Sequence, residues 1–180
     1  MPLPLVALFL TAFGIGTAEF VIAGLLPEVS TDLGVSIPTA GFLITAYAIG
    51  VAVGGPIVTL LTARFSRKAT ILALVAAFTI GQALCALAPT YPLLMAARLL
   101  VSVGHGAFFG VAAIVATRLV PPEKAGSAVA MLLAGITVAN ILGVPGGTAI
   151  GNMFGWRATF WAVGLLGLAW FLATGILLPA

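Results

Sequence analysis

Charged side chains are scarce in this sequence. Seven of its 180 residues are lysine or arginine and four are aspartate or glutamate, so charged residues make up only 6%, whereas an ordinary soluble domain has about a quarter. Hydrophobic residues make up 62%, which is more apolar surface than a soluble fold of this size can bury. The composition therefore excludes a soluble domain and predicts that the chain lies in a lipid bilayer.

The residue types that most often bind metals or form disulfides are almost missing. The chain has one cysteine, Cys85, and one histidine, His105, so neither a disulfide framework nor a metal site is expected. It has no HExxH motif and no glycine-rich phosphate loop that ends in lysine. Its net charge of +3 comes without the basic patch that nucleic-acid binding needs. We therefore expect no enzyme activity, no cofactor or metal, and no nucleic-acid partner.

Long hydrophobic runs dominate what the sequence does contain. A transmembrane helix needs about 20 mostly apolar residues, and six runs reach that length, at residues 5–26, 39–62, 69–88, 92–118, 127–152 and 158–178. Prolines, glycines or charged residues separate the runs. The sequence therefore predicts an all-α membrane protein with six transmembrane helices.

Basic residues are distributed unequally between the two sets of loops. One set carries five basic residues: Arg64, Arg67, Lys68, Arg118 and Lys124. The loops on the other side have only Arg157 close by, together with the acids Glu28 and Asp32. Because short cytoplasmic loops are enriched in lysine and arginine, we expect the first set, and with it both ends of the chain, to face the cytoplasm.

Two glycine-rich stretches resemble each other. GGPIVTLLTARFS (54–66) and GVPGGTAIGNMFG (143–155) align at one constant offset, with four matches: Gly54 with Gly143, Pro56 with Pro145, Thr59 with Thr148, and Phe65 with Phe154. An odd number of spans separates the stretches, so they cross the membrane in opposite directions. This predicts two inverted three-helix repeats, about 1–90 and 91–180, as in transporters that alternate access. Chance matching among glycine-rich helices is the alternative.

Two residues of opposite charge lie inside the apolar runs. Glu19 lies ~12 Å below the outer end of the first run, and Arg98 lies ~9 Å below the outer end of the fourth. A charge that faces lipid at a helix centre costs ~2.5–3.5 kcal/mol on the insertion scale. We therefore expect both side chains to face the interior of the bundle, where they pair with each other or line a water-filled cavity.

The intramembrane acid suggests a mechanism. If a cavity opened in turn to each side of the membrane, Glu19 would take a proton from one side and release it to the other. Because protonation removes the charge of the carboxylate, a cationic or neutral substrate would compete with the proton. Glu19 and Arg98 are thus the candidate proton-coupling residues. The alternative is a fixed Glu19–Arg98 pair that only holds two helices together.

Three further polar residues within the runs are candidate substrate contacts. Tyr47, His105 and Asn140 carry hydrogen-bonding groups that a small-molecule substrate would use. His105 lies ~20 Å deep and also suits proton transfer. Each of the three has a structural alternative, which is a packed histidine or a hydrogen bond between helices.

Several motifs appear in a fixed order along the chain. They are TAEFVIAGLLPEV (17–29), LLTARFSRKATIL (60–72), ARLLVSVGHG (97–106), GITVANILGVPGGTAIG (135–151) and GWRATF (155–160). Together they resemble the major facilitator superfamily, specifically its drug:proton antiporter branch with chloramphenicol-resistance, arabinose-efflux and purine-efflux members. The resemblance covers all six predicted spans.

The resemblance implies roles for three groups of residues. Arg64, Arg67 and Lys68 match the superfamily loop G-x-L-A-D-R-x-G-R-K, which implies a cytoplasmic gating loop, although Ala63 replaces the aspartate. Arg98 matches the arginine of the fourth-span motif that is tied to proton transfer. In the fifth span the resemblance implies an antiporter-motif helix built on three residues, Gly143, Pro145 and Gly147.

The resemblance also implies a function. It predicts a transporter of the bacterial inner membrane that exports a small hydrophobic or amphipathic compound, such as a drug, sugar or nucleobase, by proton antiport with alternating access. Since the superfamily has twelve spans, residues 1–180 are expected to be an N-terminal half that works with a missing C-terminal half or with a second copy. An uncoupled sugar or nucleoside facilitator and a non-transporting structural membrane subunit are the alternatives.

Overall fold

A computed structural model describes residues 2–178 as a bundle of helices joined by short turns. Six helical units are long and apolar enough to cross a membrane: Leu3–Asp32, Ile37–Leu61, Arg67–Leu87, Tyr91–Arg118, Pro122–Phe154 and Trp156–Leu177. The all-α fold with six spans is therefore confirmed. The proposed repeats correspond to the first three and the last three units; their relationship stays a prediction, and residues 179–180 of the second lie outside the described part.

The first span is longer than predicted. It consists of α1 (Leu3–Phe20), a 3₁₀ turn η1 (Val21–Leu25) and α2 (Leu26–Asp32). We expected a break at Pro27, but Pro27 lies in the first turn of α2, where a residue without an N–H group loses no helical hydrogen bond. The helix instead ends before Gly34, whose φ of 65° is readily adopted only by glycine.

Four of the other spans are each a single α-helix. They are α3 (Ile37–Leu61), α4 (Arg67–Leu87), α5 (Tyr91–Arg118) and α8 (Trp156–Leu177). Ser36 caps α3 by accepting a hydrogen bond from the backbone N–H of Thr39, and Ser66 caps α4 by accepting one from Ala69, both at 3.2 Å. Such caps satisfy an N–H group that has no partner inside the helix.

The fifth span is interrupted. After a 3₁₀ turn η2 (Pro122–Lys124) it runs as α6 (Ala125–Val138), a π-helical turn η3 (Ala139–Gly143) and α7 (Val144–Phe154). Pro145 lies in the first turn of α7. Its ring would clash with the carbonyl of Ile141 in a continuous α-helix, and the wider π turn just before it relieves that clash. The irregularity beside Pro145 thus takes the form of a π turn.

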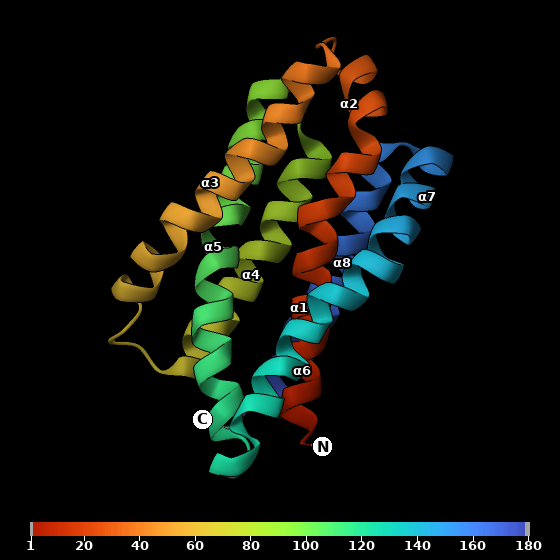
Figure 1. The fold of residues 1–180 in the computed structure, drawn as a ribbon. Helices are drawn as coiled ribbons and strands as arrows, with labels where there is room; N and C mark the ends of the chain where they lie inside the picture. The colour runs from red at the N-terminus through yellow and green to blue at the C-terminus, as the bar shows by residue number, and fades with distance from the viewer. Residues whose placement is uncertain (1, 179–180) are drawn as a thin grey trace.

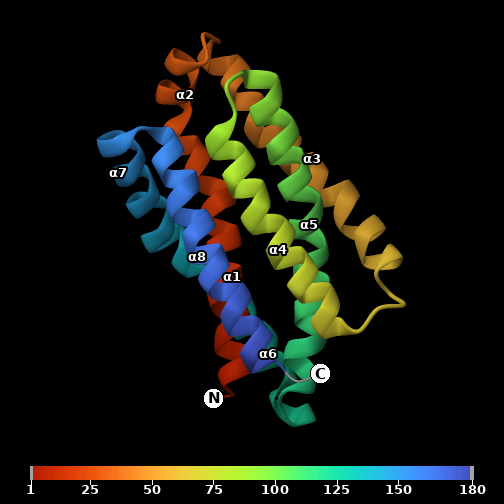
Figure 2. The ribbon, with the colours of Figure 1, turned by 180° about the vertical axis from the view of Figure 1, so that it is seen from behind.

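The packing order of the helices places the first span at the centre of one side of the bundle. The helix α1 packs against α6 and α8, α4 lies between α5 and α8, and α3 runs along α5, as Figures 1 and 2 show from opposite sides. The α3–α4 loop, the α5–α6 link, the start of α1 and the end of α8 share one end (lower in Figure 1). This end, called the basic end below, carries Arg64, Arg67, Lys68, Arg118 and Lys124.

Two buried apolar clusters fill the bundle, one toward each end. The cluster toward the basic end includes Ile71, Phe108 and Val111, and the cluster toward the opposite end includes Ile22 and Phe160. Large apolar side chains also cover the outer surface of the bundle, as expected where lipid chains are the solvent. The polar residues described next lie between the two clusters.

Candidate functional site

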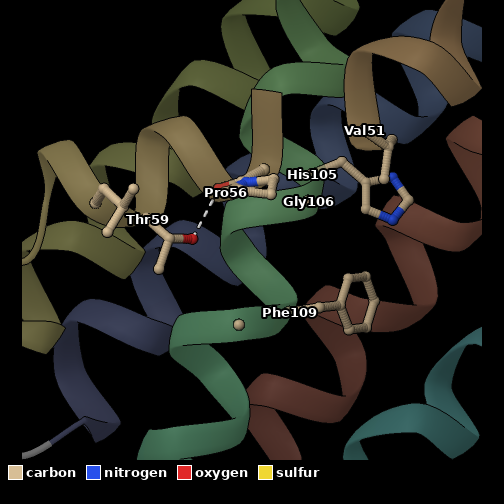
Figure 3. A pocket seen from close by; sticks show the side chains of 9 residues that line it. Val51, Pro56, Thr59, His105, Gly106 and Phe109 are labelled. Carbon is tan, nitrogen blue, oxygen red and sulfur yellow. Dashed lines mark hydrogen bonds between the residues drawn. The ribbon is translucent and has the colours of Figure 1, made fainter. Parts of the chain in front are cut away.

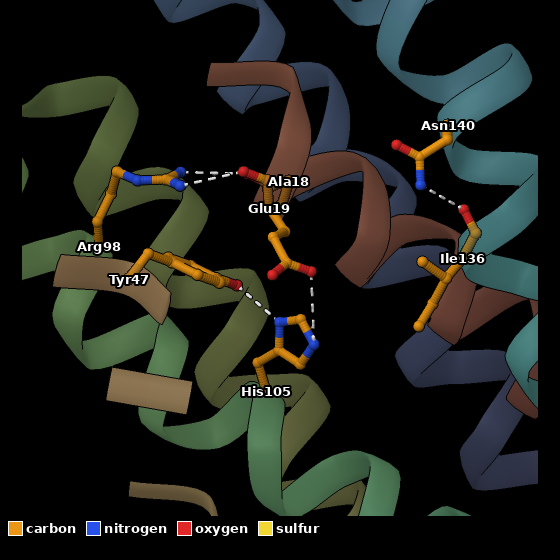
Figure 4. Close-up of polar contacts among 7 residues, drawn as sticks. All are labelled: Ala18, Glu19, Tyr47, Arg98, His105, Ile136 and Asn140. Atoms are coloured by element: carbon orange, nitrogen blue, oxygen red, sulfur yellow. Dashed lines mark hydrogen bonds and ion pairs between the residues drawn. The ribbon is translucent and has the colours of Figure 1, made fainter. Parts of the chain in front are cut away.

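A small group of polar side chains lies where the first, second and fourth spans meet (Figure 4). Glu19 comes from the last turn of α1, Tyr47 from α3, and Arg98 and His105 from α5. The last two are seven residues apart, which is two helical turns, so they point from the same face of α5. The interior location predicted for Arg98 is confirmed, since its side chain is buried, whereas Glu19 is only partly buried. Tyr47 and His105 are buried as well.

Arg98 is satisfied by the backbone of its neighbours. It is 2% exposed and donates from Nη1 to the carbonyl of Ala18 at 3.1 Å and from Nη2 to the carbonyl of Glu19 at 3.3 Å. These carbonyls are available because α1 gives way to η1 at this point and the last carbonyls of an α-helix lack an i+4 donor. The guanidinium carbon also lies 4.5 Å from the centre of the Tyr47 ring. Arg98 thereby ties α1, α3 and α5 together.

The carboxylate of Glu19 faces a histidine instead of the arginine. Its Oε2 lies 3.8 Å from Nε2 of His105, and its side chain is 23% exposed. Among residues 2–178 no ion pair joins the side chains of Glu19 and Arg98, so the side-chain pair that the sequence suggested is replaced by a contact to the main chain of Glu19. The physical reason is that matching depth fixes the height of two residues but not the rotation of their helices.

His105 connects Glu19 to Tyr47. Its Nδ1 lies 3.1 Å from the hydroxyl of Tyr47. If that hydroxyl donates to Nδ1, the proton of the neutral imidazole is carried on Nε2, which faces Glu19. The ring of Phe109 packs against the imidazole, with ring centres 5.2 Å apart. Tyr47, His105 and Glu19 therefore form a continuous polar chain across α3, α5 and α1.

A groove begins at His105 and runs toward the basic end (Figure 3). It has a volume of about 590 Å³ and lies between α3 and α5, lined by Val51, Gly55, Pro56, Thr59, Leu60, His105, Gly106, Phe109 and Gly110. The sequence analysis missed this groove. Its signal was the set of small residues on both helices, because Gly55 and Gly106 bring the two backbones into contact and leave little side-chain volume beside them.

Asn140 lies apart from this chain of side chains. It is exposed on the π turn η3, and its Nδ2 donates to the carbonyl of Ile136 at 3.0 Å. Figure 4 draws it away from Tyr47 and His105. Of the three candidate substrate contacts, the structure therefore brings two together, and a substrate role for any of them stays a prediction.

The predicted antiporter-motif helix packs directly on the first span. A Cβ added at Gly143 would lie 2.0 Å from Oγ1 of Thr17, and one added at Gly147 would lie 2.8 Å from Cγ2 of Val21. The carbonyl of Gly147 also accepts a hydrogen bond of 2.7 Å from Thr159. These glycines allow η3 and α7 to pack closely against the segment of α1 and η1 that contains Glu19.

The basic residues of the predicted gating loop lie at the basic end, away from Glu19. Arg64 is exposed in the α3–α4 loop, whereas Arg67 and Lys68 begin α4. The Nζ of Lys68 donates to the carbonyl of Leu178 at 2.6 Å, so this side chain links α4 to the end of α8. Within residues 2–178 no three His, Cys, Asp or Glu side chains gather closely enough to hold a metal ion.

Comparison with known protein families decides what this bundle is. A sequence model described as Major Facilitator Superfamily matches residues 8–180. The chain belongs to the major facilitator superfamily. The relationship covers nearly its whole length and agrees with the six apolar spans.

Curated relatives within the superfamily include bacterial transport proteins. The chain is 50% identical over 165 residues to the inner membrane transport protein YdhP of Escherichia coli K12 and 45% identical over 165 residues to the putative transporter AraJ of the same organism. It is 44% identical over 163 residues to a chloramphenicol resistance protein of Streptomyces lividans. The alignments cover 91–92% of this chain but 42% of each relative, so the chain spans less than half of their length.

Solved structures of the superfamily share this fold. The proton:xylose symporter XylE bound to 6-bromo-6-deoxy-D-glucose superimposes with a TM-score of 0.83 at 18% sequence identity, over 96% of this chain and 43% of that one. The inward open conformation of XylE from E. coli gives a TM-score of 0.82 at 19% identity, over 94% of this chain and 46% of that one. At this level of identity the likeness concerns the fold alone.

Proposed function

We propose that this chain is the N-terminal six-helix half of an exporter that exchanges a small hydrophobic or amphipathic compound for protons by alternating access. Its partner is a second six-helix unit, either the C-terminal half of the same protein or a second copy. The basic end faces the cytoplasm of a bacterial cell, in line with the positive-inside rule. The relatives named as transport and resistance proteins support export, because they match over nearly the whole of this chain.

The placement of the charged groups around Glu19 carries the proposal of proton coupling. A carboxylate that is paired with a buried arginine resists protonation, since breaking such a pair leaves an uncompensated buried charge at a cost of about 3–5 kcal/mol. In this bundle Arg98 instead bonds to carbonyl oxygens, and the carboxylate faces an imidazole that can be neutral. Glu19 can therefore gain and lose a proton without stranding Arg98.

The groove between α3 and α5 suggests the route that the proton and the substrate take. His105 belongs both to the polar chain with Glu19 and to the wall of the groove. Val51, Pro56 and Phe109 make the groove mostly apolar, which suits a hydrophobic or amphipathic compound. In the proposed orientation the groove extends from the coupling site toward the cytoplasm, and a substrate entering it would meet His105 and, next to it, Glu19.

Replacement of Glu19 tests the coupling. Everted vesicles that contain the protein as its gene encodes it would be supplied with chloramphenicol, the compound in the name of one relative, and with a proton gradient. We expect Glu19→Gln to abolish accumulation against a gradient while exchange at equilibrium persists, because the neutral amide cannot carry a proton. Glu19→Asp should keep part of the accumulation.

Glu123→Gln is the matched control, since it makes the same change at an exposed residue of the α5–α6 link. It should leave accumulation unchanged. Accumulation that persists in Glu19→Gln would show that the coupling site lies elsewhere. If the unmodified protein equilibrates but never accumulates any of a broad panel of drugs, sugars and nucleobases, the protein is an uncoupled facilitator, and if it moves none of them it is a structural subunit.

A further inference from the structure

The basic end of the bundle contains a second cavity, remote from Glu19. It has a volume of about 320 Å³ and lies where the start of α4, the end of α5 and the end of α8 meet. Its lining includes three cations and no acid: Ser66, Arg67, Lys68, Val115, Arg118, Leu119 and Leu178. Three like charges around one hollow repel one another, so the cavity is suited to a negatively charged group.

No carboxylate neutralises these cations within the described chain. Residues 2–178 form two ion pairs, Glu19 with His105 and Asp32 with Arg157, and neither involves a residue of this cavity. The Nζ of Lys68 is held by the carbonyl of Leu178 at 2.6 Å. That bond orients the ammonium group at the wall of the cavity without cancelling its full charge.

The backbone adds to the positive potential. The helix α4 begins at Arg67 and runs for 21 residues to Leu87, so its N-terminal turn lies beside the cavity with unpaired N–H groups and the positive end of the helix dipole. The Ser66 side chain accepts only the N–H of Ala69. The N–H groups of Arg67 and Lys68 have no acceptor inside the helix, and a phosphate group is a ligand that such a turn binds well.

The position of the cavity along the membrane normal identifies the source of the phosphate. At 1.5 Å per residue α4 is ~30 Å long, which equals the thickness of the hydrocarbon core of a bilayer. Its first turn therefore lies at the level of the lipid head groups. The helix α8 packs against α4, and Leu172 and Ile176 on its last turns are exposed, so acyl chains can lie against this helix. Basic pockets between membrane helices at this level are suited to anionic lipid head groups.

We propose that this cavity binds the phosphate head group of an anionic phospholipid, with Arg67, Lys68 and Arg118 as its ligands. The cavity has room for a phosphate and part of its glycerol but not for the acyl chains. Val115, Leu119 and Leu178 give it apolar walls against which the first methylene groups of the chains can pack. Binding there would link α4, α5 and α8 through one shared anion.

Lipid titration of the detergent-purified protein, as its gene encodes it, tests this site. Native mass spectrometry and thermal melting would compare phosphatidylglycerol, cardiolipin, phosphatidylcholine and inorganic phosphate. We expect the two anionic lipids to bind and to raise the melting temperature in proportion to the logarithm of their concentration. Phosphatidylcholine should bind at least tenfold more weakly, because its choline group cancels the phosphate charge.

Charge-removing variants locate the site. Arg118→Gln should weaken phosphatidylglycerol binding about fivefold, the contribution typical of one basic residue at a membrane surface. Lys124→Gln is the matched control, because Lys124 is exposed at the same end but does not line this cavity; its effect should stay within about twofold. Should Arg118→Gln fail to fold, Arg67→Gln, which removes another positive charge of the same cavity, and the comparison of lipids on the unmodified protein still decide the question.

Three results would overturn the proposal. They are phosphatidylcholine that binds as tightly as phosphatidylglycerol, a Lys124→Gln variant that weakens binding as much as Arg118→Gln, and inorganic phosphate that binds as tightly as the anionic lipids. The second result would mean diffuse surface charge and the third a free-phosphate site. None of these measurements depends on transport or on the orientation of the chain, so a failure of the lipid site and a failure of the proposed export are distinguishable.

Discussion

The interior of this bundle is unusual at the level of single residues because an arginine and a glutamate lie side by side without pairing. Arg98 is bound by carbonyl groups of the first span, and its guanidinium lies over the ring of Tyr47. Charge-assisted hydrogen bonds to several carbonyls satisfy a buried guanidinium without a carboxylate. The carboxylate of Glu19 is therefore not paired with the guanidinium of Arg98. Tyr47 contacts both Arg98 and His105.

Tyr47→Phe tests the role of this shared residue. The variant keeps the ring beneath Arg98 but removes the hydroxyl that lies 3.1 Å from Nδ1 of His105, so Tyr47 no longer influences which ring nitrogen of His105 carries the proton. We expect the initial rate of proton-driven chloramphenicol accumulation to fall about five- to tenfold, while the melting temperature changes little, since one hydrogen bond contributes about 1 kcal/mol.

Tyr91→Phe is the matched control for that experiment. The hydroxyl of Tyr91 also joins α5 to α3, through the carbonyl of Thr39 at 2.6 Å, but at the opposite end of the bundle. It should produce the same small change in melting temperature with no loss of accumulation. Equal losses in both variants would mean that Tyr47 acts only as a structural tie.

Among the helical elements, the interrupted fifth span packs closely against the first span. A Cβ at Gly143 meets the side chain of Thr17, and the neighbouring turns continue this contact through Gly147 and Val21. Small residues allow such close approach in lipid, where packing rather than the hydrophobic effect holds helices together. The contact lies two residues from Glu19, so the geometry of α7 bears directly on the site.

Gly143→Ala should destabilise this contact. The added methyl group would lie 2.0 Å from Oγ1 of Thr17, and overpacking of this kind costs about 1–3 kcal/mol. We expect a lower melting temperature in detergent, partly restored by the second change Thr17→Ala. Gly146→Ala is the control on the same span, because nothing lies within 4 Å of its added Cβ. A Gly143→Ala protein as stable as Gly146→Ala would contradict the packing described above.

The helices were more predictable from the sequence than their contacts. Hydropathy located all six spans because lipid selects for apolar composition along a whole helix. It did not anticipate that the first helix continues past Pro27 or that Ala139–Gly143 form a π turn, since neither changes the apolar composition. The buried position of Arg98 followed from the cost of exposing a charge to lipid.

The partners inside the site were less predictable because depth along a helix says nothing about rotation about its axis. Glu19 and Arg98 were correctly placed at similar heights, yet the carboxylate meets His105. One signal was available in the sequence: His105 follows Arg98 by two turns and therefore shares its face of α5. The groove at Gly55 and Gly106 had only the weaker signal of small residues on both helices, because its shape depends on how two separate helices meet.

On the scale of the whole molecule, the two ends of the bundle are held differently. At the opposite end Arg157 pairs with Asp32 and also donates to the carbonyl of Ala88 at 3.0 Å, while Trp156 donates to Asp32 at 3.1 Å. These contacts join the first, third and sixth spans directly. At the basic end the cations gather around a cavity instead, which matches the unequal distribution of charge between the loops.

Cysteine labelling in intact cells tests the proposed orientation. Cys85 is buried, so single cysteines can be introduced into a Cys85→Ala background at Thr31 and Glu123, both exposed and at opposite ends. We expect a membrane-impermeant maleimide to label Thr31→Cys and to leave Glu123→Cys unlabelled until the cells are permeabilised. The reverse pattern would place the basic end outside and contradict the positive-inside assignment.

The length of the first span has a consequence for handling the protein. Its 30 residues, Leu3–Asp32, extend ~45 Å, whereas the hydrocarbon of a bilayer is ~30 Å thick. Tilt of the span or turns beyond the lipid take up this excess length. The helix α2, which Asp32 joins to Trp156 and Arg157, forms a knob at the end opposite the basic end. Such a knob is a natural epitope for an antibody fragment, which would supply the soluble mass and the fiducial shape that small membrane proteins lack in electron cryo-microscopy.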